Sequence, residues 1–122
     1  MGSPIVHFEI LGSDLERLAA FYRALFDWTI TPVEEGGGYA MVETGGGAPG
    51  APTGGVAGFP GAPSHVTVYV GVDDVAATLA RARDLGATIV MEPREVTPGV
   101  ETALFADPEG HTIGLMRRSE PG

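Results

Sequence analysis

The sequence predicts an α+β fold built from two tandem copies of one βαβββ unit. Residues 4–11 and 64–70 both alternate apolar and polar side chains with a period of two, which is typical of strands. Each of these strands is followed directly by a helical pattern. The first copy covers about residues 4–59 and the second about 63–117, so we expect a single domain over residues 1–122.

Composition excludes several classes of protein. The net charge of −9 would repel a nucleic-acid backbone, and no apolar run is long enough to span a membrane. The chain contains no cysteine and no lysine, which excludes disulfides, thiolate ligands and Schiff-base chemistry. No secretory signal is visible. We therefore expect a cytoplasmic protein with a small-molecule ligand and without nucleic-acid or membrane partners.

The first copy continues from its opening strand into an amphipathic helix. Ser13 is placed to accept free backbone N–H groups, and Glu16 follows three residues later, which is the spacing of a capping box. A glycine within a strand often marks close approach of another backbone or of a ligand. The expected elements are a helix at about 14–26 with Phe21, Tyr22 and Phe26 in the core, strands at 28–33 and 39–44 around a turn at 34–38, and a short glycine-rich strand at 54–59.

The second copy repeats this order. Gly86 is a natural left-handed stop for its helix. Neither copy could bury both its helix and its sheet alone, so we expect the copies to share one core. The expected elements are a strand at 64–70, a helix at about 74–85, a strand at 87–91, a loop at 92–99, a strand at 100–106, a type I turn at 107–110 and a strand at 111–116.

The chemistry of the chain is expected on the opening strand of each copy. His7 and Glu9 lie on one face of the first strand, where titratable groups are unusual. His65, Thr67 and Tyr69 share one face of the second. We interpret His7 and His65 as repeated features that face a common cavity, with satisfied polar side chains as the alternative.

Four stretches, at residues 6–10, 18–28, 68–74 and 103–115, carry a family resemblance. The most specific parts are the helix end F-Y-x-x-L-F-x-W and the turn D-P-E-G. With these the chain resembles the vicinal oxygen chelate superfamily, the glyoxalase, bleomycin-resistance and extradiol dioxygenase group. The resemblance covers the whole chain. It implies a half-open mixed β-barrel with the helices outside, a cavity within, and a homodimer.

The resemblance also implies metal ligands on the first and last strands of each copy. His7 and His65 match the first-strand positions. The last-strand position of the second copy falls on Gly114, and strand 54–59 offers no donor side chain. A divalent metal held by His7 and His65 is therefore possible but not favoured, because catalytic sites usually have three protein ligands. The alternative is a site completed by a carboxylate from Glu9, Glu43 or Glu101.

These observations leave three functions open. The first is a glyoxalase-like enzyme of the lyase, isomerase or dioxygenase type, with His7, His65 and Glu9 as catalytic residues and Glu9 as a general base. The second is a protein that sequesters an antibiotic or metabolite, and the third is an accessory dimeric module. For tyrosines, packing with a bonded hydroxyl is the alternative to a ligand role. The expected ligand-binding residues are Tyr39, Met41, Thr67, Tyr69 and Phe105.

Overall fold

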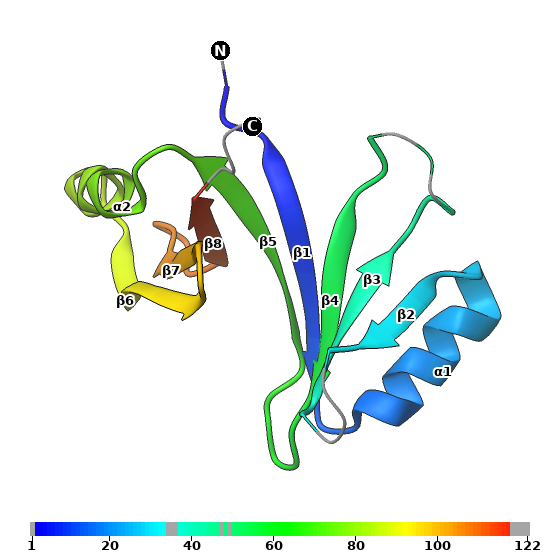
Figure 1. Ribbon diagram of the computed structural model, residues 1–122. Coiled ribbons are helices and arrows are strands. Elements are labelled where there is room, and N and C mark those ends of the chain that lie inside the picture. Colours follow the sequence, from blue (N-terminus) through cyan, green and yellow to red (C-terminus); the bar gives the residue numbers. More distant parts are fainter. Residues whose placement is uncertain (1, 34–36, 47, 49, 118–122) are drawn as a thin grey trace. The chain divides into compact units, whose positions relative to one another are not determined.

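The computed structural model describes residues 2–33, 37–46, 48 and 50–117. The chain divides into two compact units: a first unit, His7–Thr67, and a second unit made of Met1–Val6 and Val68–Gly122. Most of the turn expected at 34–38 lies outside the described residues. The elements are β1 (Ile5–Gly12), α1 (Leu15–Phe26), β2 (Thr29–Pro32), β3 (Tyr39–Glu43), β4 (Thr53–Gly58), β5 (His65–Val72), α2 (Val75–Asp84), β6 (Thr88–Thr97), β7 (Val100–Ala106) and β8 (Thr112–Arg117), as Figure 1 shows.

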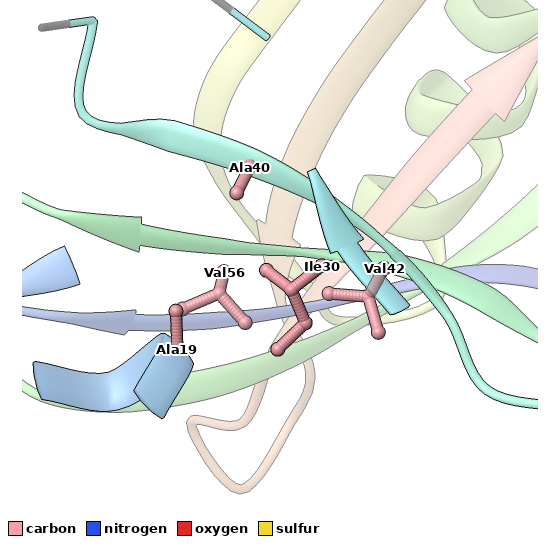
Figure 2. Packing of buried hydrophobic residues seen from close by; sticks show 5 residues of the cluster. All are labelled: Ala19, Ile30, Ala40, Val42 and Val56. Carbon is pink, nitrogen blue, oxygen red and sulfur yellow. The ribbon is translucent and has the colours of Figure 1, made fainter. Parts of the chain in front are cut away.

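The first unit is a mixed sheet with α1 against one face (Figure 1). Strand β1 pairs in parallel with β4, while β4 with β3 and β3 with β2 pair antiparallel. Strand alternation sends Phe8 and Ile10 toward the helix and sends His7 and Glu9 to the opposite face. The buried cluster on the helix side comprises Ala19, Ile30, Ala40, Val42 and Val56, shown in Figure 2.

The second unit repeats the βαβββ order. Strand β5 pairs in parallel with β8, and β8, β7 and β6 follow with antiparallel pairing. The start of the chain joins this unit, where the Gly71 N–H donates to the Pro4 carbonyl over 2.8 Å. Its buried cluster comprises Val72, Val75, Leu79, Ala103 and Leu115.

The two helices confirm the predicted segments, with one correction at a cap. Asp14, and not Ser13, is the N-cap of α1, because its Oδ1 accepts from the Arg17 N–H over 3.1 Å. Asp74 caps α2 in the same way, by accepting from the Ala77 N–H over 2.9 Å.

Two aromatic side chains on α1, Phe21 and Phe26, correct the expectation that its aromatic residues lie in the core. Tyr22 packs against the core and stacks on Trp28 with ring centroids 5.3 Å apart. Phe21 and Leu25 lie off the stripe that faces the sheet, and with Phe26 they are more than half exposed. The reason is geometric, since a helix on one face of a sheet buries only a single stripe.

Strand β6 is longer than the sequence indicates. Residues 92–97, expected as a loop, continue the strand through Pro93. The pairing of β6 with β7 shifts register between Met91 and Arg94, and β6 is the last strand in the sheet order. A bulged edge strand accommodates proline, because no partner needs the missing N–H group.

The turn that follows β7 is confirmed and carries additional hydrogen bonds. The Gly110 N–H donates to the Asp107 carbonyl over 2.8 Å. Asp107 Oδ1 accepts from the backbone N–H groups of Glu109 and His111, each over 2.9 Å. The hydrogen bond from His111 is the largest cause holding the pKa of Asp107 below its ordinary value.

The predicted α+β class with two βαβββ units is confirmed, whereas the expectation of one shared core is corrected. The described residues form two buried clusters, one inside each unit. Each helix therefore buries its own sheet face. In the part of the chain that the structure describes, neither helix has the length and hydrophobicity needed to cross a membrane.

Candidate functional site

The site face of the first unit is the sheet face opposite α1. Glu9 on β1 lies directly opposite Gly55 on β4, and Gly55 lies directly opposite Met41 on β3. Opposed residues in a sheet point to the same side, so these three positions form a row across three strands. Glu43 shares this face with Met41, because Val42 between them is fully buried in the core.

Three titratable side chains meet on this face. The Tyr39 hydroxyl lies 3.1 Å from His7 Nε2 and 3.2 Å from Glu9 Oε2. His7 Nε2 and Glu9 Oε2 are themselves 4.0 Å apart. The His7 side chain is only 10% exposed, whereas that of Glu9 is 30% exposed. The Glu9 carboxylate is therefore more open to an incoming small molecule than the His7 imidazole.

The glycine at position 55 makes room for Tyr39. A Cβ placed on Gly55 would overlap with the hydroxyl oxygen and the ring of Tyr39. The ring thus occupies the space that a side chain at position 55 would fill. The glycines of this strand were expected to mark close approach of another backbone or of a ligand, but the group that approaches Gly55 is the ring of Tyr39 on the neighbouring strand.

The single hydroxyl proton of Tyr39 defines the direction of the hydrogen bonds. Tyr39 donates this proton to Glu9, which as a carboxylate only accepts. The contact between Tyr39 and His7 then requires the imidazole to donate its Nε2–H to the phenol oxygen. The cluster is a directed chain from His7 through Tyr39 to Glu9.

His7 is held in its neutral form by its surroundings. Burial lowers the pKa of His7 from its ordinary value of 6.5, and the attraction of the Glu9 carboxylate opposes this only in part. A neutral imidazole with its proton on Nε2 matches the directed chain described above.

His65 does not occupy the position equivalent to His7. A shift of 60 residues aligns the starts of β1 and β5, at residues 5 and 65, and also the helix caps at residues 14 and 74. This shift places Thr67 at the equivalent of His7 and Tyr69 at the equivalent of Glu9. His65 is exposed, and its Nδ1 lies 3.1 Å from the Thr67 hydroxyl.

The second unit repeats the tyrosine-on-glycine arrangement. Tyr69 lies directly opposite Gly114 on β8 and is 8% exposed. A Cβ on Gly114 would overlap with the ring of Tyr69. The position at which the resemblance implies a metal-ligating glutamate is therefore filled by an aromatic ring.

The side chains present do not fit a metal centre of the kind that the resemblance implies. Among the residues that the structure describes, no three His, Cys, Asp or Glu side chains are grouped as a metal would require. Both last-strand positions, Gly55 and Gly114, are covered by tyrosine rings. Glu101 alternates with Thr102 on β7 and shares the face of the buried Ala103, away from such a site.

The remaining expected ligand-binding residues have different surroundings. Met41 is 42% exposed on the site face, opposite Gly55. Thr67 is buried beside His65. Phe105 packs against the helix-side core of the second unit, so its surroundings there are those of a core residue.

A cavity of about 920 Å³ lies elsewhere in the first unit, near the start of α1. Two of its charged residues are engaged with backbone: Asp14 caps the helix, and the Arg23 guanidinium donates to the Ile30 carbonyl over 2.5 Å. We place the candidate site at His7, Glu9 and Tyr39 instead, because there titratable side chains contact one another.

Two βαβββ units, with a cluster of titratable side chains on the sheet face opposite a helix, are typical of glyoxalase-like proteins. The sequence comparison agrees. The glyoxalase-like domain family matches residues 8–116. The chain belongs to this family.

Two curated relatives are each 30% identical to this chain over the aligned residues. The putative glyoxylase CFP32 of Mycobacterium tuberculosis (strain CDC 1551 / Oshkosh) is 30% identical over 115 residues, covering 89% of this chain and 42% of that protein. The anthracycline biosynthesis protein DnrV of Streptomyces peucetius is 30% identical over 125 residues, covering 91% of this chain and 46% of that protein. The chain spans less than half the length of these relatives.

Solved structures of similar fold cover nearly the whole chain. A variant of Streptomyces coelicolor methylmalonyl-CoA epimerase in complex with 2-nitronate-propionyl-CoA has a TM-score of 0.69 and 25% identity, over 97% of this chain and 99% of that one. A hypothetical protein from Bacillus halodurans C-125 has a TM-score of 0.76 at 13% identity, over 100% and 99% of the two chains. These likenesses bear out the fold class predicted from the sequence.

Proposed function

We propose that this chain is a small-molecule enzyme that moves a proton at a carbon next to a carbonyl group. The observation that carries the proposal is the hydrogen-bonded cluster of Glu9, Tyr39 and His7 on the site face. Membership of the glyoxalase-like family and the likeness to solved structures of methylmalonyl-CoA epimerase support it. Epimerisation at such a carbon requires the removal and return of a proton.

Glu9 is the general base in this proposal. Its carboxylate is partly exposed and can reach a bound substrate, whereas His7 is nearly buried and neutral. The C–H bond breaks, its proton passes to Glu9, and the electron pair moves onto the carbonyl oxygen of the substrate. Return of the proton to the carbon completes an epimerisation or isomerisation.

Proton exchange in D₂O tests this function. The purified protein is incubated with methylmalonyl-CoA, other acyl thioesters and small 2-oxoaldehydes, and loss of the proton signal at the reacting carbon is followed by NMR. Glu9→Gln should slow exchange at least about 100-fold, the usual contribution of a general base. Glu16→Gln, beside the cavity near α1, is the matched control and should leave the rate unchanged. The reverse pattern would place the chemistry at that cavity.

Binding without turnover is the second candidate. It is favoured by the tyrosine rings over Gly55 and Gly114, because sequestration requires no metal-ligating side chains there. The name of one relative suggests an anthracycline as a probe, and the net charge of −9 suits a cationic drug such as bleomycin. Calorimetric binding of either compound, with no proton exchange on any tested carbonyl compound, would favour this function over the first.

Two further expectations belong to the proposal. The homodimer implied by the resemblance is tested by light scattering on a sizing column. A cytoplasmic location, which suits a chain without cysteine, is tested by cell fractionation.

A further inference from the structure

Each unit has a glycine at the last-strand position, and a tyrosine ring fills the space of the missing side chain. In the first unit, Gly55 lies opposite Glu9, and the ring of Tyr39 fills the space of its missing side chain. In the second, Gly114 lies opposite Tyr69, whose own ring fills that space. The tyrosines come from different strands, β3 and β5. The repeat is therefore not a simple copy of one residue, and both last-strand ligand positions are closed.

We propose that the Tyr39 hydroxyl takes the place of a cation in this site, by donating its hydrogen bond to the carbonyl oxygen of the substrate. The assignment rests on the proposed function, because it concerns the same reaction. It makes the site independent of divalent metal.

The geometry of the hydroxyl supports this role. His7 donates to the phenol oxygen and fixes its place, while the hydroxyl proton points toward Glu9 over a long contact of 3.2 Å. Charged hydrogen bonds of this kind are normally 2.5–2.7 Å. The proton of Tyr39 is thus held near Glu9 without a tight bond, and a substrate oxygen beside Glu9 can compete for it.

The reaction itself would change the partner of this proton. When Glu9 accepts the proton of the substrate, its carboxylate becomes neutral and attracts the Tyr39 hydroxyl less. At the same moment the substrate oxygen gains the electron pair and becomes the stronger acceptor. The hydrogen bond of Tyr39 then moves to that oxygen, where preorganised donors lower the barrier most. Tyr39 keeps its proton, so the proton balance of the step is unchanged.

The first test compares Tyr39→Phe with wild type. Phenylalanine keeps the ring over Gly55 and removes only the hydroxyl, while Tyr22→Phe is the matched control elsewhere in the same unit. The probe is 2-nitronate-propionyl-CoA, whose charged oxygens imitate the developing oxyanion, with propionyl-CoA, which lacks the nitronate group, as the reference. Calorimetry should show that Tyr39→Phe weakens nitronate binding about 100-fold, the loss expected for one oxyanion donor, with propionyl-CoA binding nearly unchanged. Equal effects on both probes, or no nitronate binding by wild type, would overturn the assignment.

The second test examines metal directly. Protein purified without chelator should contain only substoichiometric divalent metal, and chelator should not alter nitronate binding or proton exchange. Stoichiometric metal that is lost in His7→Ala would overturn the inference even if proton exchange were confirmed. Tyr39-dependent nitronate binding without proton exchange on any carbonyl compound would instead uphold the inference and reject the proposed function.

Discussion

Tyr39 combines packing and chemistry in one side chain. Its ring takes the space beside Gly55, and its hydroxyl joins His7 to Glu9. Both the packing of the ring and the hydrogen bonds of the hydroxyl require Gly55, because a side chain at position 55 would overlap with the hydroxyl of Tyr39.

This dependence predicts the outcome of a double-mutant cycle. Gly55→Ala should destabilise wild type by about 1–3 kcal/mol, the usual cost of inserting atoms into a packed site. In a Tyr39→Ala background the same change should cost much less, because the ring that it meets is gone. Urea denaturation of the four proteins gives the coupling free energy, and additive costs would contradict the packing of Tyr39 on Gly55.

His7 predicts a pH-dependent stability. Its pKa is lowered in the folded protein, so between that lowered value and the ordinary value of 6.5 the unfolded chain binds more protons. The free energy of unfolding should therefore rise with pH through this window and level off above it, with a slope from this group of at most about 1.4 kcal/mol per pH unit. His7→Gln should lose this part of the slope. Parallel curves for wild type and variant would show that the His7 pKa is not lowered.

At the scale of residues, the sequence predicted which side chains form the cluster better than it predicted which of them contact one another. Strand alternation correctly placed His7 and Glu9 on one face. The pairing of His7 with His65 was wrong, because it followed residue type and not distance from the helix cap. The bridging position of Tyr39 depends on the register of β3 against β4, which no local pattern specifies.

The start of α1 provides a test at the scale of one element. Asp14→Ala should destabilise the protein by about 1 kcal/mol, because the first turn loses the acceptor of the Arg17 N–H. Ser13→Ala is the matched control, and we expect a much smaller effect there since Asp14 is the N-cap. Thermal unfolding of both variants tests this assignment. In the capping box that the sequence suggests, Ser13→Ala would be the variant that loses more stability.

The elements differ in how far the sequence could predict them. Helices with capping residues and strands bounded by turns are specified locally, and β7 was predicted with the observed bounds. Strand β6 was not, since Pro93 and the residues after it are typical of a loop. What keeps them in the sheet is pairing with β7 across several register shifts, a tertiary effect that overrides local preference.

At the scale of the whole molecule, the order of elements was predictable and the organisation of the core was not. Two βαβββ patterns follow from periodicity alone. The expectation of a single core assumed that a half of this size could not bury its own helix. Small side chains on both surfaces, Ala19 on α1 and Ala40 and Val56 on the sheet, belong to one buried cluster within the first unit.

The charge of the whole chain leads to the last prediction. The chain has sixteen acidic and seven basic residues, so like charges repel one another in the folded protein. Salt should screen this repulsion, because the Debye length is only about 10 Å at 0.1 M. We expect sodium chloride to raise the midpoint of thermal unfolding by a few degrees, which corresponds to about 1 kcal/mol or less. Magnesium chloride at equal ionic strength should give nearly the same rise, because the residues that the structure describes hold no grouped ligand set for a divalent ion. A much larger rise with magnesium, reversed by His7→Ala, would instead identify specific binding of the cation at the site face.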